Sequence, residues 1–348
     1  MKYTDIVNKH GGYWDHKNLL DFYYLVNPYF PTKKMIREIK RMSQTLITNY
    51  PACMRYMCDL ASKIYNVDSD HIVVGNGASE LIKNLCDSLK GKTGIITPTF
   101  NEYVRLVKNK VVLNDDNYSA KEIVENLSGK IQNLVLVNPQ LNTGHYLDRN
   151  EINILIDWCR SENINLILDE SFIDFADIEL AEDLRRIYDY ENLFILKSLS
   201  KSYGMPGLRL GVLASKSKLI GKIRKELPIW NISSFAEYFL EIFPRYRKDF
   251  IDSLRKIEEE KCRFKEDLKK ISGFKVRESF ANYFLVEVSS LSPDVLCREL
   301  FRKNILIRDL SERGFKNCVR ISVRSKRENK KFIKEVNRVI ANLYDFSF

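Results

Sequence analysis

The sequence lacks any long apolar run: no stretch approaches the roughly 20 consecutive apolar residues that a membrane-spanning helix requires. The first residues, MKYTDIVNKHGG, contain none of the apolar segment that marks a secretory signal peptide. The seven cysteines include no Cys-x-x-Cys pair, and an odd number without metal-ligand spacing argues against both disulfides and a bound metal. We therefore expect a reduced protein of the cytoplasm, in which most cysteines are small core residues.

Motifs for nucleic-acid binding are also absent: there is no helix-turn-helix, zinc-finger or aromatic RNA-binding signature. The net charge is nevertheless +10, but the cations are interleaved with acids, as in LRKIEEEKCRFKEDLKK, which is typical of a solvated helix face. A small anionic substrate explains the excess of positive charge about as well as a nucleic acid does. We expect neither nucleic acid nor a membrane as a partner.

Short β-rich apolar runs recur along the chain and are separated by stretches with helical periodicity. In RNEINILIDWCRSEN, four apolar residues fall on one face of a helix, namely Ile152, Leu155, Ile156 and Cys159. Strands that alternate with helices predict an α/β fold with a mostly parallel sheet that is covered on both faces. The apolar runs are residues 71–75, 94–98, 134–139, 164–170, 193–198 and 209–215.

The C-terminal third has a different pattern. The strand-like segments ANYFLVEVSS and VRISVRS precede an amphipathic helix with five apolar residues on one stripe, namely Phe332, Val336, Val339, Ile340 and Leu343. This pattern predicts a smaller α+β part. We expect a large domain over residues 35–245 and a small domain made of residues 1–34 and 246–348.

Unusual polar and glycine residues follow the carboxyl ends of five of the predicted strands. Open parallel sheets bind ligands in the crevice at that edge. One such coincidence would be weak evidence, but five predict a site. The segments are Gly75-Asn76-Gly77-Ala78-Ser79-Glu80, Thr97-Pro98-Thr99-Phe100, Asn138-Pro139, Asp169-Glu170 and Lys197-Ser198-Leu199-Ser200-Lys201.

Two of these segments predict a phosphate site. The glycine-rich turn opens a helix, whose N-terminus offers free N–H groups to an anion, although a plain tight turn would have the same sequence. The serines after the 193–198 strand add hydroxyl donors, and a nearby arginine adds a fixed cation. The residues expected to hold the phosphate are Gly77, Ala78, Ser79, Ser198, Ser200 and Arg209.

Asp169 and Lys201 suggest which molecule carries that phosphate. A carboxylate at the end of a buried strand needs a cationic partner, which is either a structural arginine or lysine or the protonated ring nitrogen of a pyridoxal cofactor. Such a cofactor also needs a lysine for its Schiff base, and Lys201 lies directly beside the phosphate-binding serines. A surface position is reasonable for Lys197 but not for Lys201. Phe100 is either a core residue or stacks on the cofactor ring.

The segment SLSKSYGMPGLRLG resembles the lysine segment of fold-type I pyridoxal-phosphate enzymes, Ser-x-Ser-Lys-x-x-Gly-x-x-Gly-x-Arg-x-Gly. The resemblance covers nearly the whole chain: GNGASELI is similar to the phosphate cup, TPTFNEY to the ring-stacking segment and LILDESFIDF to the segment of the ring-nitrogen aspartate. The order and spacing match the histidinol-phosphate aminotransferase and threonine-phosphate decarboxylase branch. This implies an aspartate aminotransferase-like fold and pyridoxal 5'-phosphate as the cofactor, with Lys201 and Asp169 as catalytic residues.

The same resemblance implies a second subunit and a substrate site. ITNYPA is similar to the segment whose tyrosine, here Tyr50, reaches the cofactor phosphate of the neighbouring subunit, which implies a homodimer. VRISVRS is similar to the segment whose arginine, here Arg320, binds the substrate carboxylate. Arg324 lies four residues on along the same predicted strand, and Arg308 approaches from the preceding strand end. Such a cluster would hold a second anion such as a phosphate, unless Arg324 merely pairs with a surface acid.

Two segments depart from the family pattern. Where the family has Asn-Pro-x-Asn-Pro-Thr-Gly, this chain reads NPQLNTG, so Leu141 replaces the asparagine that contacts the ring oxygen of the cofactor. Either Asn142 reaches that oxygen from a shifted backbone or the contact is missing. The other segment, DFYYLVNP, has Tyr23 and Leu25 where the decarboxylase pattern Asp-Phe-Ser-x-Asn-x-Asn-Pro has serine and asparagine, which argues against the same phosphate-bearing substrate.

The sequence therefore predicts a pyridoxal-phosphate aminotransferase that acts on a small, anionic and in particular phosphorylated keto substrate. A decarboxylase of a phosphorylated amino acid is the alternative, and HGG, LDFYYLVNP and ILIRDL resemble that side of the branch. A catalytically dead binding module is a third possibility, against which Lys201 and Asp169 argue. Besides the arginines, His10 and Tyr23 are expected to contact the substrate.

Overall fold

The structure, a computed structural model, describes residues 3–345 except 10, 13, 15 and 17. It divides into two compact units. The large unit contains residues 26–141 and 145–255, and the small unit contains residues 1–25, 142–144 and 256–348. Within the described residues, no helix combines the length and the apolar character that crossing a bilayer demands.

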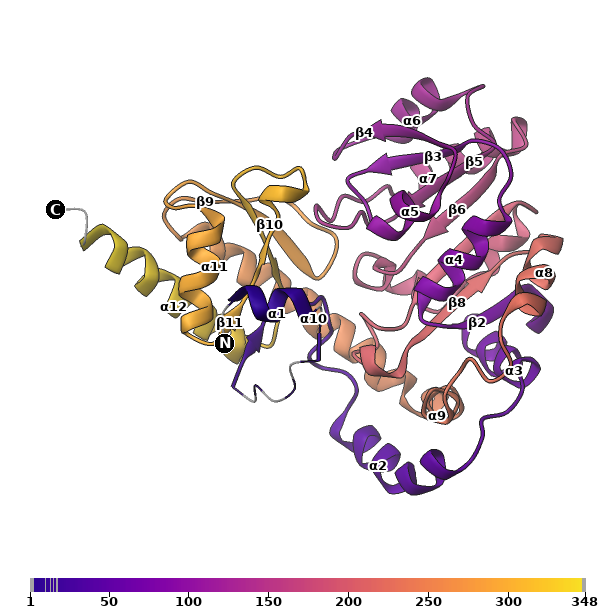
Figure 1. Ribbon diagram of the computed structural model, residues 1–348, viewed down its shortest axis with the longest axis horizontal. Coiled ribbons are helices and arrows are strands. Elements are labelled where there is room, and N and C mark those ends of the chain that lie inside the picture. Colours follow the sequence, from indigo (N-terminus) through magenta and orange to yellow (C-terminus); the bar gives the residue numbers. More distant parts are fainter. Residues whose placement is uncertain (1–2, 10, 13, 15, 17, 346–348) are drawn as a thin grey trace. The chain divides into compact units, whose positions relative to one another are not determined.

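A seven-stranded sheet with the order β2-β8-β7-β6-β5-β3-β4 forms the centre of the large unit (Figure 1). β8 runs antiparallel to its neighbours β2 and β7, and the other pairs are parallel. All five residues of β5 and of β8 are buried, as expected for strands covered on both faces. The predicted α/β fold with a mostly parallel sheet is therefore confirmed. The strands are β2 (Ile72–Asn76), β3 (Thr93–Thr97), β4 (Lys110–Asn114), β5 (Asn133–Val137), β6 (Asn165–Asp169), β7 (Leu193–Ser198) and β8 (Leu210–Ala214).

Helices cover both faces of this sheet. On one face, apolar residues of α4, α5 and α8 pack with strand residues such as Val73, Ile167 and Leu213 in one core cluster. In α7, all four residues predicted to share an apolar face are buried, and Asp148 caps the helix by accepting a hydrogen bond from the backbone N–H of Glu151. The helices are α2 (Lys33–Thr48), α3 (Met54–Tyr65), α4 (Ala78–Ser88), α5 (Asn101–Leu106), α6 (Ala120–Leu127), α7 (Arg149–Ser161), α8 (Lys218–Glu226) and α9 (Ser234–Ile242), and α10 (Arg247–Lys269) begins in this unit.

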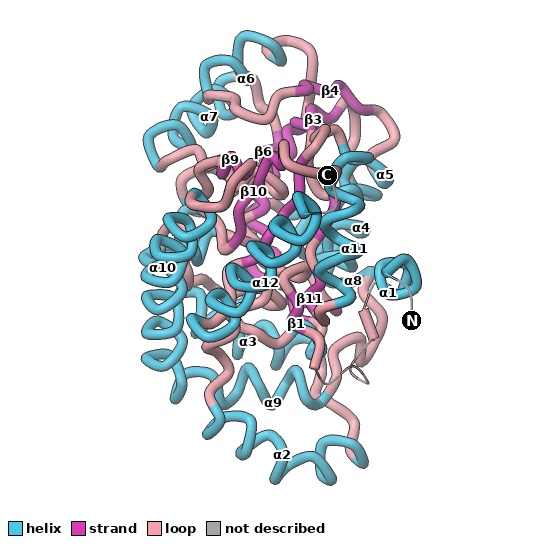
Figure 2. Tube along the Cα trace, turned by 90° about the vertical axis from the view of Figure 1, so that its left-hand side faces the viewer, coloured by secondary structure: helices cyan, strands magenta, loops and turns pink. Residues whose placement is uncertain are grey.

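The small unit contains a four-stranded antiparallel sheet with the order β12-β13-β10-β9 and a parallel pair, β1 and β11. Residues of β13 alternate: Val319 and Ile321 join the apolar core, and Arg320 points to the opposite face. The same core contains Phe332, Val336, Val339 and Ile340 of the predicted stripe of the last helix. α11 packs against α12 (Figure 2). The elements are α1 (Tyr3–Lys9), β1 (Leu20–Asp21), β9 (Phe274–Val276), β10 (Tyr283–Val288), α11 (Pro293–Arg302), β11 (Ile305–Leu306), β12 (Arg308–Asp309), β13 (Cys318–Ser322) and α12 (Lys326–Asp345).

Short 3-10 turns connect several of these elements. They matter for the site because the segment between β6 and β7 contains three of them and the turn after Lys201 contains another. The turns are η1 (Ser69–His71), η2 (Ile173–Phe175), η3 (Ile178–Leu180), η4 (Arg185–Tyr188), η5 (Pro206–Leu208), η6 (Phe243–Tyr246) and η7 (Ser311–Arg313).

Candidate active site

The five segments predicted to form a site do meet at one edge of the large sheet. β2, β3, β5, β6 and β7 run in the same direction, so their carboxyl ends share that edge. β8 runs the opposite way and begins there, directly after Arg209. The strand register places Asn76 opposite Leu210 and Ser198 opposite Gly211, so Arg209 lies next to the glycine-rich turn and to the serines.

Gly77 and Arg209 form a cradle at the start of α4. Gly77 has φ 74°, and a Cβ atom there would lie 2.1 Å from Nη2 of Arg209. The backbone N–H of Gly77 donates to the carbonyl of Arg209 at 2.9 Å, and Nη1 of Arg209 lies 3.4 Å from Oγ of Ser200. Among the described residues, no carboxylate forms an ion pair with Arg209. A cation without an acid partner, at the N-terminus of a helix and beside hydroxyl groups, fits a phosphate.

Asp169 lies at the end of β6 and is 3% exposed. Its Oδ1 atom accepts hydrogen bonds from the backbone N–H (3.0 Å) and the hydroxyl (2.6 Å) of Ser171, and its Oδ2 atom accepts one from the hydroxyl of Tyr103 (2.9 Å). Burial raises the pKa of Asp169, and these three hydrogen bonds counteract the shift. No arginine or lysine of the described residues pairs with it, and a protonated pyridine nitrogen would supply a cationic partner.

Lys201 is half-buried in the turn after β7, and its backbone is held on both sides. Its carbonyl accepts hydrogen bonds from the N–H groups of Asn27 (2.9 Å) and Gly204 (3.2 Å). The amide of Asn27 also donates to the carbonyl of Ser202 at 2.8 Å. These bonds fix the path of the chain through Lys201, which a reactive lysine needs for a defined approach to its target. Phe100 is half-buried at the N-cap of α5, with its ring 6.5 Å from that of Tyr103.

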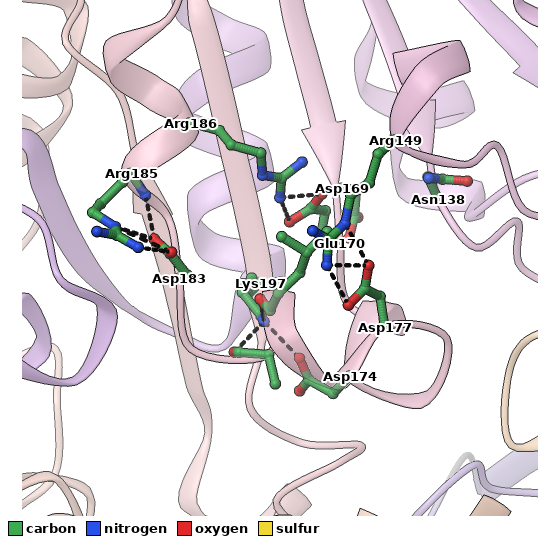
Figure 3. Close-up of polar contacts among 12 residues, drawn as sticks. Asn138, Arg149, Asp169, Glu170, Asp174, Asp177, Asp183, Arg185, Arg186 and Lys197 are labelled. Carbon is green, nitrogen blue, oxygen red and sulfur yellow. Dashed lines mark hydrogen bonds and ion pairs between the residues drawn. The ribbon is translucent and has the colours of Figure 1, made fainter. Parts of the chain in front are cut away.

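Lys197 is not a surface residue, and the sequence-based reading of it was wrong. The side chain is 1% exposed, and its Nζ lies 2.5 Å from Oδ1 of Asp174, which is equally buried (Figure 3). The hydroxyl of Ser202 donates to the other oxygen of Asp174. A second buried acid, Glu170, pairs with Arg186 at 2.6 Å. Because β7 is covered on both faces, a lysine on it can only be buried, and it therefore needs an acid.

Arg320 and Arg308 form a second cationic site, in the small unit. They lie opposite one another on β13 and β12, and Arg320 is 2% exposed. Arg320 donates to Oδ1 of Asn142 at 3.0 Å and to the carbonyl of Tyr23 at 3.1 Å, and Arg308 lies 4.9 Å above the ring of Tyr23. Burial and the charge of Arg308 lower the pKa of Arg320 to about 9. No carboxylate in the described part of the chain pairs with either guanidinium, and both Nε atoms are buried without a partner there, which favours an anionic ligand.

Asn142 adopts φ 92°, in the left-handed region of the backbone. Its Oδ1 is occupied by Arg320, and its amide NH₂ has no partner among the described residues, so this group remains available as a donor. Whether it donates to a cofactor oxygen stays a prediction.

Arg324 is not on the strand predicted for it, because β13 ends at Ser322. Its guanidinium lies 3.1 Å from Glu328, as in the alternative of a pair with an acid.

Tyr50 is 78% exposed and its ring stacks on Trp230 at 4.4 Å. His10 lies outside the described residues. The sequence reasoning missed Tyr103 and Ser171, although both lie within segments that it had singled out.

Comparison with known proteins identifies what this chain resembles. Residues 26–336 match the model of the family described as aminotransferase class I and II. The chain is 32% identical to CMP-5'-(3-aminopropyl)phosphonate synthase of Streptomyces rubellomurinus, covering 95% of this chain but only 54% of the relative, so it spans about half of that protein. It is 31% identical to L-serine phosphate decarboxylase of Sulfurospirillum multivorans, covering 89% of this chain and 85% of the relative. The solved histidinol-phosphate aminotransferase of Clostridium acetobutylicum matches with a TM-score of 0.83 and 25% identity, over 93% of this chain and all of that one.

Proposed function

Because this chain belongs to the class I and II aminotransferase family, whose fold-type I enzymes depend on pyridoxal phosphate, we propose that it decarboxylates a small phosphorylated amino acid. The observation that carries this proposal is the pair of Arg308 and Arg320, of which Arg320 is buried and Arg308 half-buried, and which has no acid partner among the described residues. Transamination, which the sequence analysis predicted, is the second candidate.

The charge of the arginine pair supports a phosphate as its ligand. Two guanidinium groups are balanced by a dianion, and a phosphate monoester carries a charge of about −1.5 to −2 at neutral pH, whereas a carboxylate carries −1. The planar guanidinium groups also match the oxygens of a phosphate in bidentate geometry. If the pair holds the substrate phosphate, the α-carboxylate is not held there and is free to leave as carbon dioxide. If the pair holds the α-carboxylate, the Cα–H bond is the one that breaks.

The residues of the large unit would serve either reaction. When bound, pyridoxal phosphate takes up the electron pair that remains at the substrate Cα after bond cleavage. Asp169 would keep the ring nitrogen protonated, and the cradle of Gly77 and Arg209 would hold the cofactor phosphate. In decarboxylation Lys201 would deliver a proton to Cα in place of the lost carboxylate, so that the products are carbon dioxide and the phosphorylated amine. In transamination Lys201 would first remove the proton from Cα.

Transamination is supported by the resemblance of VRISVRS to the segment whose arginine, here Arg320, binds the substrate carboxylate. An aminotransferase must bind two substrates in turn, an amino donor and a keto acceptor. A decarboxylase needs to bind only one. The two candidates therefore differ in the ligands that they accept.

We also propose that the protein acts as a homodimer with Tyr50 serving the site of the partner. Tyr50 lies among apolar residues that are exposed in the isolated chain: Ile47 is 73%, Ile229 75% and Trp230 50% exposed. An exposed apolar group of this kind is typical of an interface. The hydroxyl of Tyr50 has no partner among the described residues and would be available to a phosphate.

The test compares the two reactions on the purified protein loaded with pyridoxal phosphate. O-phospho-L-serine and O-phospho-L-threonine are supplied alone, and carbon dioxide is measured; glutamate is supplied with a phosphorylated keto acid or ketone, and 2-oxoglutarate is measured. We expect carbon dioxide from a phospho-amino acid and none from unphosphorylated L-serine. Arg308→Gln should raise the KM for the phosphorylated substrate at least tenfold, while Arg302→Gln, an exposed α11 arginine paired with Glu299, should not. Formation of 2-oxoglutarate without carbon dioxide would establish transamination instead.

A further inference from the structure

Asp169 is held by two side chains from different parts of the chain, Ser171 and Tyr103. A carboxylate offers about four positions for hydrogen-bond donors. The N–H and hydroxyl of Ser171 and the hydroxyl of Tyr103 occupy three of them, at distances of 2.6–3.0 Å. One position is left, on a group that is 3% exposed and needs a cationic partner.

Ser171 has a further contact that fixes the direction of its hydroxyl. The backbone N–H of Ser198 donates to Oγ of Ser171 at 3.2 Å. A hydroxyl has a single hydrogen, so Oγ accepts from Ser198 and donates its own hydrogen to Asp169. Ser198 is the last residue of β7 and lies three residues before Lys201. The hydroxyl of Ser171 thus connects the aspartate at the end of β6 to the lysine segment at the end of β7.

The geometry points to Ser171 and Tyr103 as positioning residues that orient Asp169 toward the ring nitrogen of the cofactor and favour its ionised form. Their three donor groups use three of the four acceptor positions of the carboxylate, so only one position, in one fixed direction, remains for the cofactor. They also offset the effect of burial, which favours the protonated form of Asp169. A protonated carboxyl would be a poor partner for a pyridinium group, because the attraction between opposite charges would be lost.

The proposed role of Ser171 and Tyr103 differs from a purely structural role in which ligands it affects. A structural role would affect every ligand of the site equally. A role through Asp169 affects only ligands that carry a proton on the ring nitrogen. This inference rests on the proposed role of Asp169 toward the cofactor, but it does not depend on whether the reaction is decarboxylation or transamination.

The test measures binding to the cofactor-free protein rather than activity. The two probes are pyridoxal phosphate and its analogue in which a C–H group replaces the ring nitrogen. Ser171→Ala and, separately, Tyr103→Phe should weaken the binding of pyridoxal phosphate about tenfold and leave the binding of the analogue nearly unchanged. Ser171→Thr, which keeps the hydroxyl, should restore most of the affinity.

Ser62→Ala provides the matched control, because Ser62 is half-buried in the same unit and donates to the carbonyl of Asp59, far along the chain from Asp169. It should change neither affinity. Two variants at separate positions keep the test decisive if one of them fails to fold. Equal weakening of both probes, or no weakening of either, would overturn the inference. If wild-type protein bound both probes with the same affinity, the role of Asp169 itself would be wrong, whichever reaction the enzyme performs.

Discussion

Replacement of Lys197 by methionine should destabilise the protein strongly, because it removes one partner of a fully buried ion pair. Lys197 and Asp174 are each 1% exposed, and their charged atoms are 2.5 Å apart. Lys197 also donates to the carbonyls of Leu180 and Ala181. Methionine retains most of the volume of the aliphatic stem, so the cavity that it leaves is small.

The size of the effect follows from the burial of the pair. Removing one partner of a buried pair costs about 3–5 kcal/mol. A unit of about 200 residues loses about 2–4 °C of melting temperature per kcal/mol, so the midpoint should fall by at least ~6 °C. Lys83→Met is the matched control: Lys83 pairs with Asp87 at 2.8 Å, but the two side chains are 64% and 46% exposed. An exposed pair of this kind contributes about 0–1 kcal/mol.

The loss of stability in Lys197→Met should also depend on pH. Burial raises the pKa of Asp174 above 3.8, and Lys197 counteracts that shift. Without Lys197 the folded-state pKa rises further, so the folded variant keeps a proton that the unfolded chain has released. Its stability therefore falls as the pH rises through that window, and the deficit should be smaller near about pH 5 than near about pH 8.

Thermal unfolding of wild type and variants at both pH values checks this prediction. The double variant Lys197→Met with Asp174→Leu should recover most of the lost stability, because it leaves no unpaired charge. A melting temperature of Lys197→Met equal to that of wild type would refute the argument, as would a deficit that does not change with pH.

Three further predictions concern the cofactor and the substrate. Gly77→Ala should weaken the binding of pyridoxal phosphate at least about tenfold but not the binding of phosphate-free pyridoxal, because the new Cβ would lie 2.1 Å from Nη2 of Arg209. Equal effects on both ligands in a fluorescence titration would contradict a phosphate site at Gly77 and Arg209. Tyr50→Phe should reduce cofactor affinity by about 1.5–3 kcal/mol, and an active monomer in sedimentation would exclude a shared site. Arg320→Lys should lower turnover at least tenfold, a loss above ~1.4 kcal/mol, with cofactor binding unchanged; unaltered turnover would remove Arg320 from the substrate site.

Several features could be predicted from the sequence because they depend on local patterns. The alternation of apolar runs and helical stretches determines an α/β sheet, and the burial of Ile152, Leu155, Ile156 and Cys159 follows from their helical spacing. The segments that meet at one sheet edge were also predictable, because parallel strands bring their carboxyl ends together. The cofactor followed from the residue types in those segments, above all Lys201.

Tertiary structure alone decided which side chains meet. The residue type of Lys197 suggests a surface position, but β7 is buried on both faces, and the acid that pairs with it comes from a loop 23 residues earlier in the chain. Tyr103 reaches Asp169 across 66 residues, and Asn142 reaches Arg320 across 178 residues. Arg324 is not part of the predicted strand, because β13 ends at Ser322, two residues before it. Spacing along the sequence determines neighbours only within one helix or strand. Contacts between elements depend on how the elements pack, and in this protein they decide the hydrogen bonds of Asp169, the burial of Lys197 and the position of Arg308 opposite Arg320.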